Sequence, residues 1–235
     1  METLEEVNRE GRERLHPSLT DPSWLVLSRR RQIFQDWAVA LGNHQLSVLD
    51  LGGRLQPYRP LLAGRFRRYV GVDLRPTALV NIVARAEQIP LAGEQFDLVI
   101  CTQMLEYIPE PQVVIAEIQR VLRPGGCLWL SVPTIWLRDA DEECWRFLPH
   151  GLRHLLSAFS RVEVLPEGGS IVGFFRTINA CLDVFVRSAG LRKIFRHTLC
   201  PVINLSGSLL DRFSGFMLMS IGAFMLVMGL LILWR

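Results

Sequence analysis

The chain has 235 residues, a formal net charge of +3 and 49% hydrophobic residues. This length allows a sizeable buried core, and the nearly balanced charge argues against a strongly basic nucleic-acid-binding protein. The five cysteines are scattered and form no Cys-x-x-Cys pair. They are interpreted as reduced thiols, which excludes a disulfide framework and a zinc site built on cysteines.

Residues 1–22 are mostly polar, and a mobile lead-in is expected there. From residue 23 to residue 41 the apolar side chains recur mostly at helical spacing, which predicts a helix. The run Arg29-Arg30-Arg31 interrupts this pattern. It is interpreted as a solvated face, with contacts to lipid headgroups or to a cofactor carboxylate as the alternative.

Short apolar runs and helical segments then alternate along the chain. Helices are expected over 57–64, 109–126 and 151–159, and strands over 46–51, 68–74, about 80–83, 96–102, 127–133 and 161–169. This alternation predicts an α/β fold with a doubly wound, mostly parallel sheet that helices cover on both faces. The ligand of such a sheet is expected at the carboxyl ends of its strands.

Residues 170–212 are apolar with intermittent arginines. Ile178, Leu182, Phe185 and Val186 are spaced to share one face of a helix. Two interpretations stay open for this segment. It is either a helix on a membrane surface or over a hydrophobic pocket, or an ordinary helical cap on the sheet.

The last segment, 213–235, has no charged residue between Phe213 and Trp234. That length is sufficient for a helix to cross a bilayer, so a C-terminal transmembrane helix is expected. The alternative is that Gly222–Gly229 forms a further strand of the sheet, although strands rarely reach the length of the whole apolar run.

Two patterns around this segment concern its partners. Gly215, Gly222 and Gly229 recur every seven residues, which permits close helix pairing and self-association in a membrane. Basic residues precede the segment and only Arg235 follows it. The positive-inside bias therefore predicts a domain on the cytoplasmic face of a membrane, or a soluble cytoplasmic protein if the segment is a strand.

Acidic residues and glycines follow the first two expected strands. Asp50 ends the first strand, and Gly52-Gly53 follow, where the lack of a Cβ lets the backbone approach a ligand. Asp73 ends the second strand, where an acidic side chain binds the two hydroxyls of a ribose. Asp73 read alone could equally cap a helix. Together the two signals favour a ribose-containing cofactor, and the lack of a Gly-x-Gly-x-x-Gly turn argues against a dinucleotide.

Residues 86–133 carry a resemblance to a known family. Phe96-Asp97-Leu98-Val99 and Arg120-Val121-Leu122-Arg123-Pro124-Gly125-Gly126 resemble the core of class I S-adenosylmethionine-dependent methyltransferases, the type 11 group in particular. The stretches 145–147 and 151–156 resemble the segment before that family's last helix. The resemblance covers roughly residues 24–169 and implies a Rossmann-like methyltransferase domain over 23–169.

The resemblance also implies roles for individual residues. S-adenosylmethionine is the expected cofactor, and its acceptor is expected to be a small molecule, a lipid or a lipid-linked glycan. No metal is expected, because His150 and His154 have no third ligand nearby in the sequence. Gln103 and Tyr107 are expected on the acceptor side, and the cofactor-binding residues are expected to be Asp50, Gly52, Gly53, Asp73, Leu74, Ala86, Glu87, Cys101 and Thr102.

Three residues depart from the family pattern. Arg54 replaces a glycine, and its side chain is expected to swing out or to pair with the cofactor carboxylate. Arg85 stands where an aspartate usually receives the adenine amino group, a hydrogen bond that a guanidinium cannot accept. Tyr107 stands in for the histidine of the family's Leu-Glu-His sequence. These departures leave open a second hypothesis, a non-catalytic binding module that keeps the fold.

Overall fold

The computed structural model describes residues 3–42, 44–134, 142–186 and 188–233, with side chains as far as residue 213. The chain divides into two compact units. The first unit comprises Met1–His16 and Arg30–Leu165, and the second comprises Pro17–Arg29 and Pro166–Arg235. Residues 17–29, which the sequence did not set apart, therefore group with the carboxyl-terminal part of the chain.

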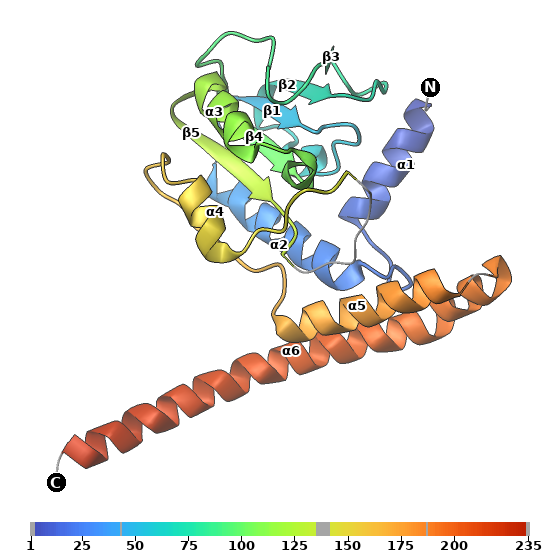
Figure 1. The fold of residues 1–235 in the computed structure, drawn as a ribbon, viewed down its shortest axis with the longest axis vertical. Helices are drawn as coiled ribbons and strands as arrows, with labels where there is room; N and C mark the ends of the chain where they lie inside the picture. Colours follow the sequence, from blue (N-terminus) through green and yellow to red (C-terminus); the bar gives the residue numbers. More distant parts are fainter. Residues whose placement is uncertain (1–2, 43, 135–141, 187, 234–235) are drawn as a thin grey trace. The chain divides into compact units, whose positions relative to one another are not determined.

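The first unit is built on a parallel sheet of five strands in the order β3-β2-β1-β4-β5 (Figure 1). Every neighbouring pair of strands is parallel. The strands are β1 (Leu46–Leu51), β2 (Phe66–Asp73), β3 (Ile82–Val83), β4 (Phe96–Thr102) and β5 (Leu122–Ser131). The predicted parallel α/β fold is therefore confirmed.

Helices cover both faces of this sheet. One face packs on α2 (Trp24–Ala40) through Val48, Leu98 and Ile100. The rings of Phe34 and Trp37 stack on each other, and Trp129 packs at a tilt against both. The opposite face packs on α3 (Pro111–Val121) and α4 (Pro149–Leu155). Alternate residues of β1 enter the two cores, and all six are buried. Burial on both sides is why the strands read as continuous apolar runs.

The strand order reverses at the centre of the sheet. From β1 the chain crosses to β2 on one side, and from β3 it returns to β4 on the other side of β1. Such a switch point leaves a crevice at the carboxyl ends of the central strands. Asp50, Asp73 and Thr102 all lie at these strand ends.

Two expectations for the first unit are wrong. The lead-in contains a helix, α1 (Leu4–Leu15), begun by a capping box between Thr3 and Glu6. Val7 and Leu15 are the hydrophobic side chains that it buries, too few to give a clear apolar period. Residues 161–169 form no strand, although they alternate like one. A strand needs a hydrogen-bonded neighbour, and the described sheet offers this segment none.

Other boundaries differ in detail. The helical segment expected at 57–64 is a short 3₁₀ turn, η1 (Arg59–Leu62). The helix expected over 109–126 ends at Val121, and β5 begins at once with Leu122. The Pro124-Gly125-Gly126 sequence therefore lies inside β5 rather than between helix and strand. The pairing of β4 with β5 shifts register there, which accommodates these residues.

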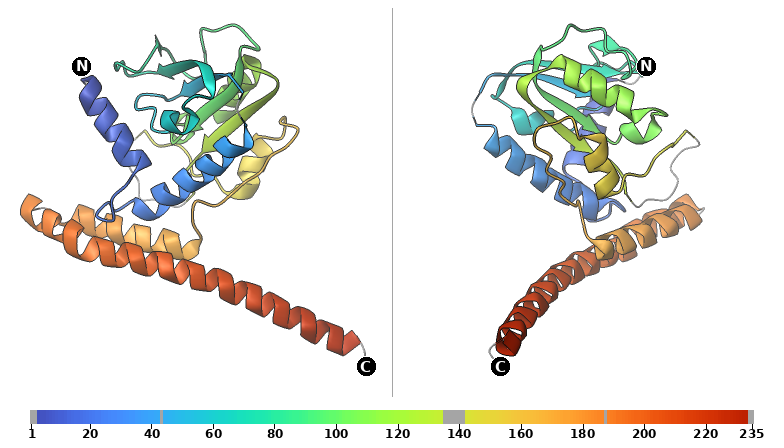
Figure 2. Two further views of the ribbon diagram at one scale, coloured as in Figure 1. Left: turned by 180° about the vertical axis from the view of Figure 1, so that it is seen from behind. Right: turned by 60° about the vertical axis from the view of Figure 1, so that its left-hand side comes forward.

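The second unit contains a helical hairpin. Figure 2 shows α5 (Ser170–Phe185) and α6 (Ala189–Leu233) running side by side. Asn179 and Asn204 are fully buried between them, and the Asn179 amide donates to Asn204 Oδ1 at 2.9 Å. The Asn204 amide donates to the carbonyl oxygens of Leu19 and Asp21, each at 2.9 Å. These hydrogen bonds fix residues 17–29 on α6.

The predicted carboxyl-terminal membrane helix is not supported by the described structure. Among the described residues, no helix is both long enough and apolar enough to span a membrane. The side chains of 214–235, on which the span and the self-association through Gly215, Gly222 and Gly229 depend, lie outside the described residues. The alternative that Gly222–Gly229 forms a strand is wrong, because α6 continues as a helix to Leu233.

Candidate functional site

The turn after β1 depends on two glycines. Gly52 has φ of +77°, a conformation that favours glycine. A Cβ on Gly53 would lie 2.6 Å from the carbonyl oxygen of Asp50. The N–H groups of both glycines donate to the Val72 carbonyl oxygen, at 2.9 Å and 3.1 Å. The turn therefore holds the end of β1 directly against the end of β2.

Asp73 lies beside this turn. Its carboxylate accepts the N–H of Arg54 at 3.2 Å and the N–H of Arg75 at 2.8 Å. No helix follows Asp73, so the alternative that it caps a helix is wrong. The Arg75 contact is a local turn bond, and the Arg54 contact joins Asp73 to the glycine turn. Each carboxylate oxygen keeps acceptor capacity beyond its one bond. The side chain is thus oriented at a strand end with room to accept further hydrogen bonds, as a pair of ribose hydroxyls requires.

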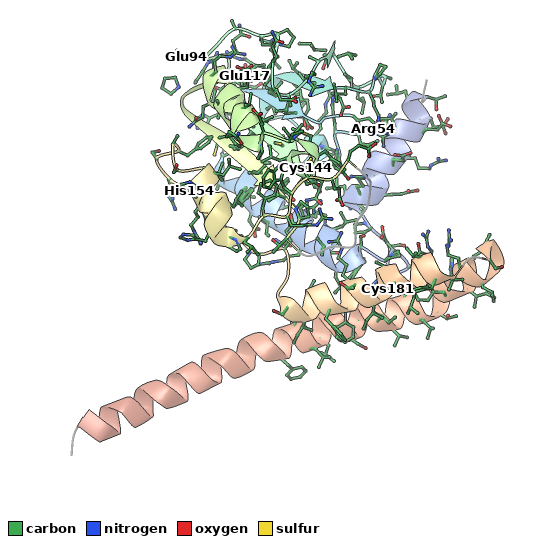
Figure 3. All side chains as sticks on the ribbon, in the orientation of Figure 1. Arg54, Glu94, Glu117, Cys144, His154 and Cys181 are labelled. Carbon is green, nitrogen blue, oxygen red and sulfur yellow. The ribbon has the colours of Figure 1, made fainter. Side chains whose placement is uncertain are left out.

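The two unusual arginines both have protein carboxylates as partners. Arg54, labelled in Figure 3, donates to Glu10 of α1 at 3.1 Å. Its side chain has swung out of the glycine turn, which is one of the two outcomes expected from the sequence. Arg85 is largely exposed and pairs with Glu87. Neither guanidinium is left as a lone charge at the strand ends.

Asp50 is buried beneath Gly53. Tyr69 donates to its carboxylate at 2.6 Å. Burial raises the pKa of Asp50 to about 7, against the lowering effect of the Tyr69 hydrogen bond, and nearby Asp73 raises it further. Asp50 therefore changes charge close to neutral pH, directly under the proposed cofactor position.

The remaining predicted cofactor residues have different surroundings. Ala86 and Glu87 follow β3 in a loop that begins at Ala84, whose N–H donates to the Asp73 carbonyl oxygen at 3.1 Å. Ala86 is buried, whereas Leu74 is exposed. Cys101 is fully buried in the core, and burial raises the pKa of its thiol. Cys101 therefore stays a protonated packing residue at the end of β4, beside half-buried Thr102.

Gln103 and Tyr107 flank the short turn after β4. Gln103 has φ of +50°, and its N–H donates to the Ser131 carbonyl oxygen at 2.8 Å. Its side-chain amide donates to the Ser131 hydroxyl at 3.1 Å, so Gln103 ties the ends of β4 and β5 together. Tyr107 ends the 3₁₀ turn η2 (Leu105–Tyr107). Among the described residues, no group of His, Cys, Asp or Glu side chains is suited to hold a metal ion.

Sequence reasoning missed Glu106, which lies in η2 between these two residues. Its side chain is 3% exposed, and its Oε2 atom has no hydrogen-bond partner among the described residues. Burial raises the pKa of Glu106 to about 7, although its own backbone N–H and then Arg30 lower it. Such a carboxyl group can exchange a proton near neutral pH. The resemblance of Leu105-Glu106-Tyr107 to Leu-Glu-His was the available signal.

Arg30 was misread as well. It is 4% exposed, so the interpretation of the Arg29-Arg30-Arg31 run as a solvated face is wrong for its central residue. The flanking Arg29 is exposed, as expected. A helix that packs one face on a sheet must bury one residue of any three in succession, and here that residue is an arginine near Glu106.

The fold defines a Rossmann-like domain, with the glycine turn and Asp73 at the strand ends where a ribose-containing cofactor is expected. Residues 49–130 match the family described as a methyltransferase domain. This match confirms the resemblance to class I S-adenosylmethionine-dependent methyltransferases of the type 11 group, and it covers the glycine turn, Asp73 and the turn after β4.

Curated relatives of this chain are also named as methyltransferases. The chain is 46% identical over 127 residues to a ubiquinone biosynthesis O-methyltransferase of Pseudomonas syringae pv. tomato, covering 53% of this chain and 48% of that protein. It is 44% identical over 145 residues to the protein of the same name from Pseudomonas putida, covering 58% and 57% of the two chains. The chain thus spans about half the length of these relatives.

A solved structure shows a more distant likeness. The S-adenosylmethionine-dependent methyltransferase of Aquifex aeolicus is 19% identical, and the overlap covers 59% of this chain and 82% of that chain with a TM-score of 0.44.

Proposed function

We propose that the chain is an S-adenosylmethionine-dependent methyltransferase that methylates a hydroxyl group of a small, quinone-precursor-like acceptor. The match of residues 49–130 and the names of the curated relatives support the reaction class. The acceptor rests on those names alone, which belong to proteins that this chain covers by about half. Its identity is therefore the part of the proposal that most needs a direct experiment.

One observation carries the proposal. The glycine turn after β1 and the carboxylate of Asp73 are joined by the Arg54 N–H, so the two elements expected to hold a nucleoside cofactor form one unit. A side chain at Gly53 would collide with the Asp50 carbonyl oxygen, so the bare backbone there is required by the fold. The residues present therefore fit S-adenosylmethionine.

The proposed roles follow from these positions. Asp73 would accept the ribose hydroxyls, and the Gly52-Gly53 turn would lie under the methionine part. When bound, S-adenosylmethionine supplies an electrophilic methyl group. Gln103 and Tyr107 would orient the acceptor, and an ionised Glu106 is the buried carboxylate best suited to take the proton of the acceptor hydroxyl. The protein otherwise aligns the reactants and excludes water.

Calorimetric titration with S-adenosylmethionine tests the cofactor site. The full-length protein should bind saturably, and Asp73→Ala should weaken binding by roughly 10- to 100-fold, because a carboxylate loses its hydrogen bonds to the ribose. Asp36→Ala, which removes a carboxylate of α2 that accepts a bond from Gln32, is the matched control and should bind normally. The non-catalytic-module hypothesis gains only if the unmodified protein shows no saturable binding.

The acceptor is tested by incubating purified protein with labelled S-adenosylmethionine and a bacterial lipid extract. Label should appear in a phenolic, lipid-soluble product. Label in a carboxyl ester or in a glycan would refute the hydroxyl acceptor while leaving methyl transfer intact. Purified phenols with and without an isoprenoid tail then define which part of the acceptor is recognised.

We also propose that residues 213–235 attach the enzyme to the cytoplasmic face of a membrane. The sequence supports this through its uncharged run and through the basic residues that precede it, Arg192, Lys193, Arg196 and Arg212. After extraction of cell membranes at alkaline pH, the full chain should stay in the membrane pellet. Release into the supernatant would contradict the anchor without affecting the proposed reaction.

A further inference from the structure

One side of α6 carries large apolar side chains with no described partner. Seven of them are between 54% and 60% exposed: Leu191, Ile194, Leu199, Val202, Leu205, Leu209 and Phe213. With 3.6 residues per turn, these positions fall within about 140° of arc on one side of the helix. We name this set the α6 stripe. At the turn end of the hairpin, Val184 and Phe185 of α5 are also exposed.

The α6 stripe is not needed for the hairpin itself. The opposite side of α6 carries the buried contacts, since Cys200 and Asn204 are fully buried there. A Cβ on Gly207 would lie 2.9 Å from Phe175 of α5, so the two helices approach closely on that side. The fold of the second unit is therefore complete without the stripe.

Charge and continuity indicate what covers the stripe. The side chains of α6 from residue 189 to residue 213 include Arg192, Lys193, Arg196 and Arg212 but only one acidic residue, Asp211. Arg212 is exposed at the edge of the stripe, whereas exposed Lys193 lies on another side of the helix. Anionic lipid headgroups attract such residues while the apolar side chains enter the acyl boundary.

Helix α6 also extends beyond residue 213, the last residue whose side chain is described. The same α6 continues to Leu233 through a sequence without charge. A groove on a protein partner would cover one side of the helix and leave the uncharged continuation in water. A lipid surface accommodates both, because its apolar layer extends along the whole helix.

We infer that the α6 stripe binds the surface of an anionic phospholipid bilayer, with Arg212 at the headgroup level. This inference deepens the proposed membrane attachment, because it places lipid contacts upstream of residue 213. It is independent of methyl transfer. The second unit would then hold the enzyme along a membrane through the described part of the chain, in addition to any anchor beyond it.

Fluorescent labelling of the full chain tests the inference. Cys127, Cys144 and Cys181 are replaced by serine, and buried Cys101 and Cys200 remain; Cys144 and Cys181 are labelled in Figure 3. An environment-sensitive probe is attached at Leu209→Cys on the stripe or at Lys193→Cys on another side of the helix. With phosphatidylglycerol vesicles, quenching by acrylamide should fall roughly five-fold at position 209 and change little at position 193.

The outcomes separate the proposals. Equal quenching at both positions in vesicle-bound protein would overturn the inference but leave the membrane anchor standing. Protection at position 209 without vesicles, increasing with protein concentration, would instead show that a second copy covers the stripe. As a label-free check, Leu209→Gln should weaken binding to phosphatidylglycerol vesicles several-fold, and Ser208→Gln on the same turn should not. Circular dichroism and S-adenosylmethionine titration confirm that each variant is folded.

Discussion

Two carboxyl groups of the first unit are held away from water, and both have a raised pKa. Burial raises the pKa of Asp50 and of Glu106 to about 7. In the unfolded chain these groups ionise near pH 4. Between these values the native state binds more protons than the unfolded state, so stability falls as pH rises from about 4 to about 7. Above that window both states are ionised, and these groups add no further change.

Asp50→Asn should remove part of this pH dependence. Tyr69 can still donate to the asparagine carbonyl, but no buried charge forms. We expect the unmodified protein to lose about 5 kcal/mol of unfolding free energy from pH 5 to pH 8, and Asp50→Asn to lose roughly half as much. Urea unfolding at both pH values measures this. Asp36→Asn is the exposed control, and an identical pH slope in Asp50→Asn and the unmodified protein would contradict the assignment.

The glycine turn offers a second test at the residue scale. Gly53→Ala places a Cβ against the backbone of Asp50, which cannot move without disturbing β1. We expect a loss of about 1–3 kcal/mol and weaker binding of S-adenosylmethionine. Gly151→Ala in α4 meets no atom within 4 Å and should be neutral or stabilise by up to about 1 kcal/mol. Urea unfolding of the two variants side by side gives the comparison.

At this scale the sequence predicted what local motifs encode and missed what depends on distant neighbours. The positions of Asp50, Gly52 and Asp73 at the ends of β1 and β2 were predicted correctly, because glycines and acidic residues follow apolar strands. The partner of Arg54 is Glu10, a residue of a helix that the sequence did not predict. The burial of Glu106 near Arg30 joins segments far apart in the chain, and spacing alone cannot reveal such a pair.

At the scale of helices and strands, the sequence again predicted what local patterns encode and missed what depends on distant neighbours. The limits of β1 and β4 were predicted to the residue, because burial on both faces leaves an uninterrupted apolar run. Residues 161–169 alternate apolar and polar side chains but have no neighbouring strand to pair with. The amino-terminal α1 depends on its capping box and on two buried side chains, so its signal was too sparse for a periodicity argument.

The hydrogen bonds of the buried asparagines in the α5–α6 hairpin can be tested by substituting Asn204. Asn204→Ala would leave the Asn179 amide without its acceptor and would remove one hydrogen bond from each of the Leu19 and Asp21 carbonyl groups. The second unit should lose about 2–4 kcal/mol, and amide hydrogens of residues 17–29 should exchange faster. Ser206→Ala on the same helix is the control. Unchanged exchange in residues 17–29 would show that Asn204 does not hold this segment.

For the whole molecule, the division into two units has a measurable consequence. A cofactor bound at the strand ends of the first unit stabilises the state that binds it, by about 2.7 kcal/mol at a hundred-fold excess over the dissociation constant. Hydrogen exchange with S-adenosylmethionine should therefore slow in β1, β2 and β4. The α5–α6 hairpin belongs to the other unit and should exchange as before. Equal protection of both units would show that they unfold as one.

The contacts of the amino-terminal helix α1 affect the design of truncated forms of this protein. Gly11 of α1 sits so close to the Leu55 carbonyl oxygen that an added Cβ would lie 2.9 Å from it, and Glu10 neutralises Arg54 in the adjoining turn. Deleting the first sixteen residues would remove the carboxylate partner of Arg54 and leave an unneutralised guanidinium beside the glycine turn. A shortened protein should therefore bind S-adenosylmethionine more weakly than the full chain if the cofactor lies where we propose, because the cofactor's sulfonium is also positive.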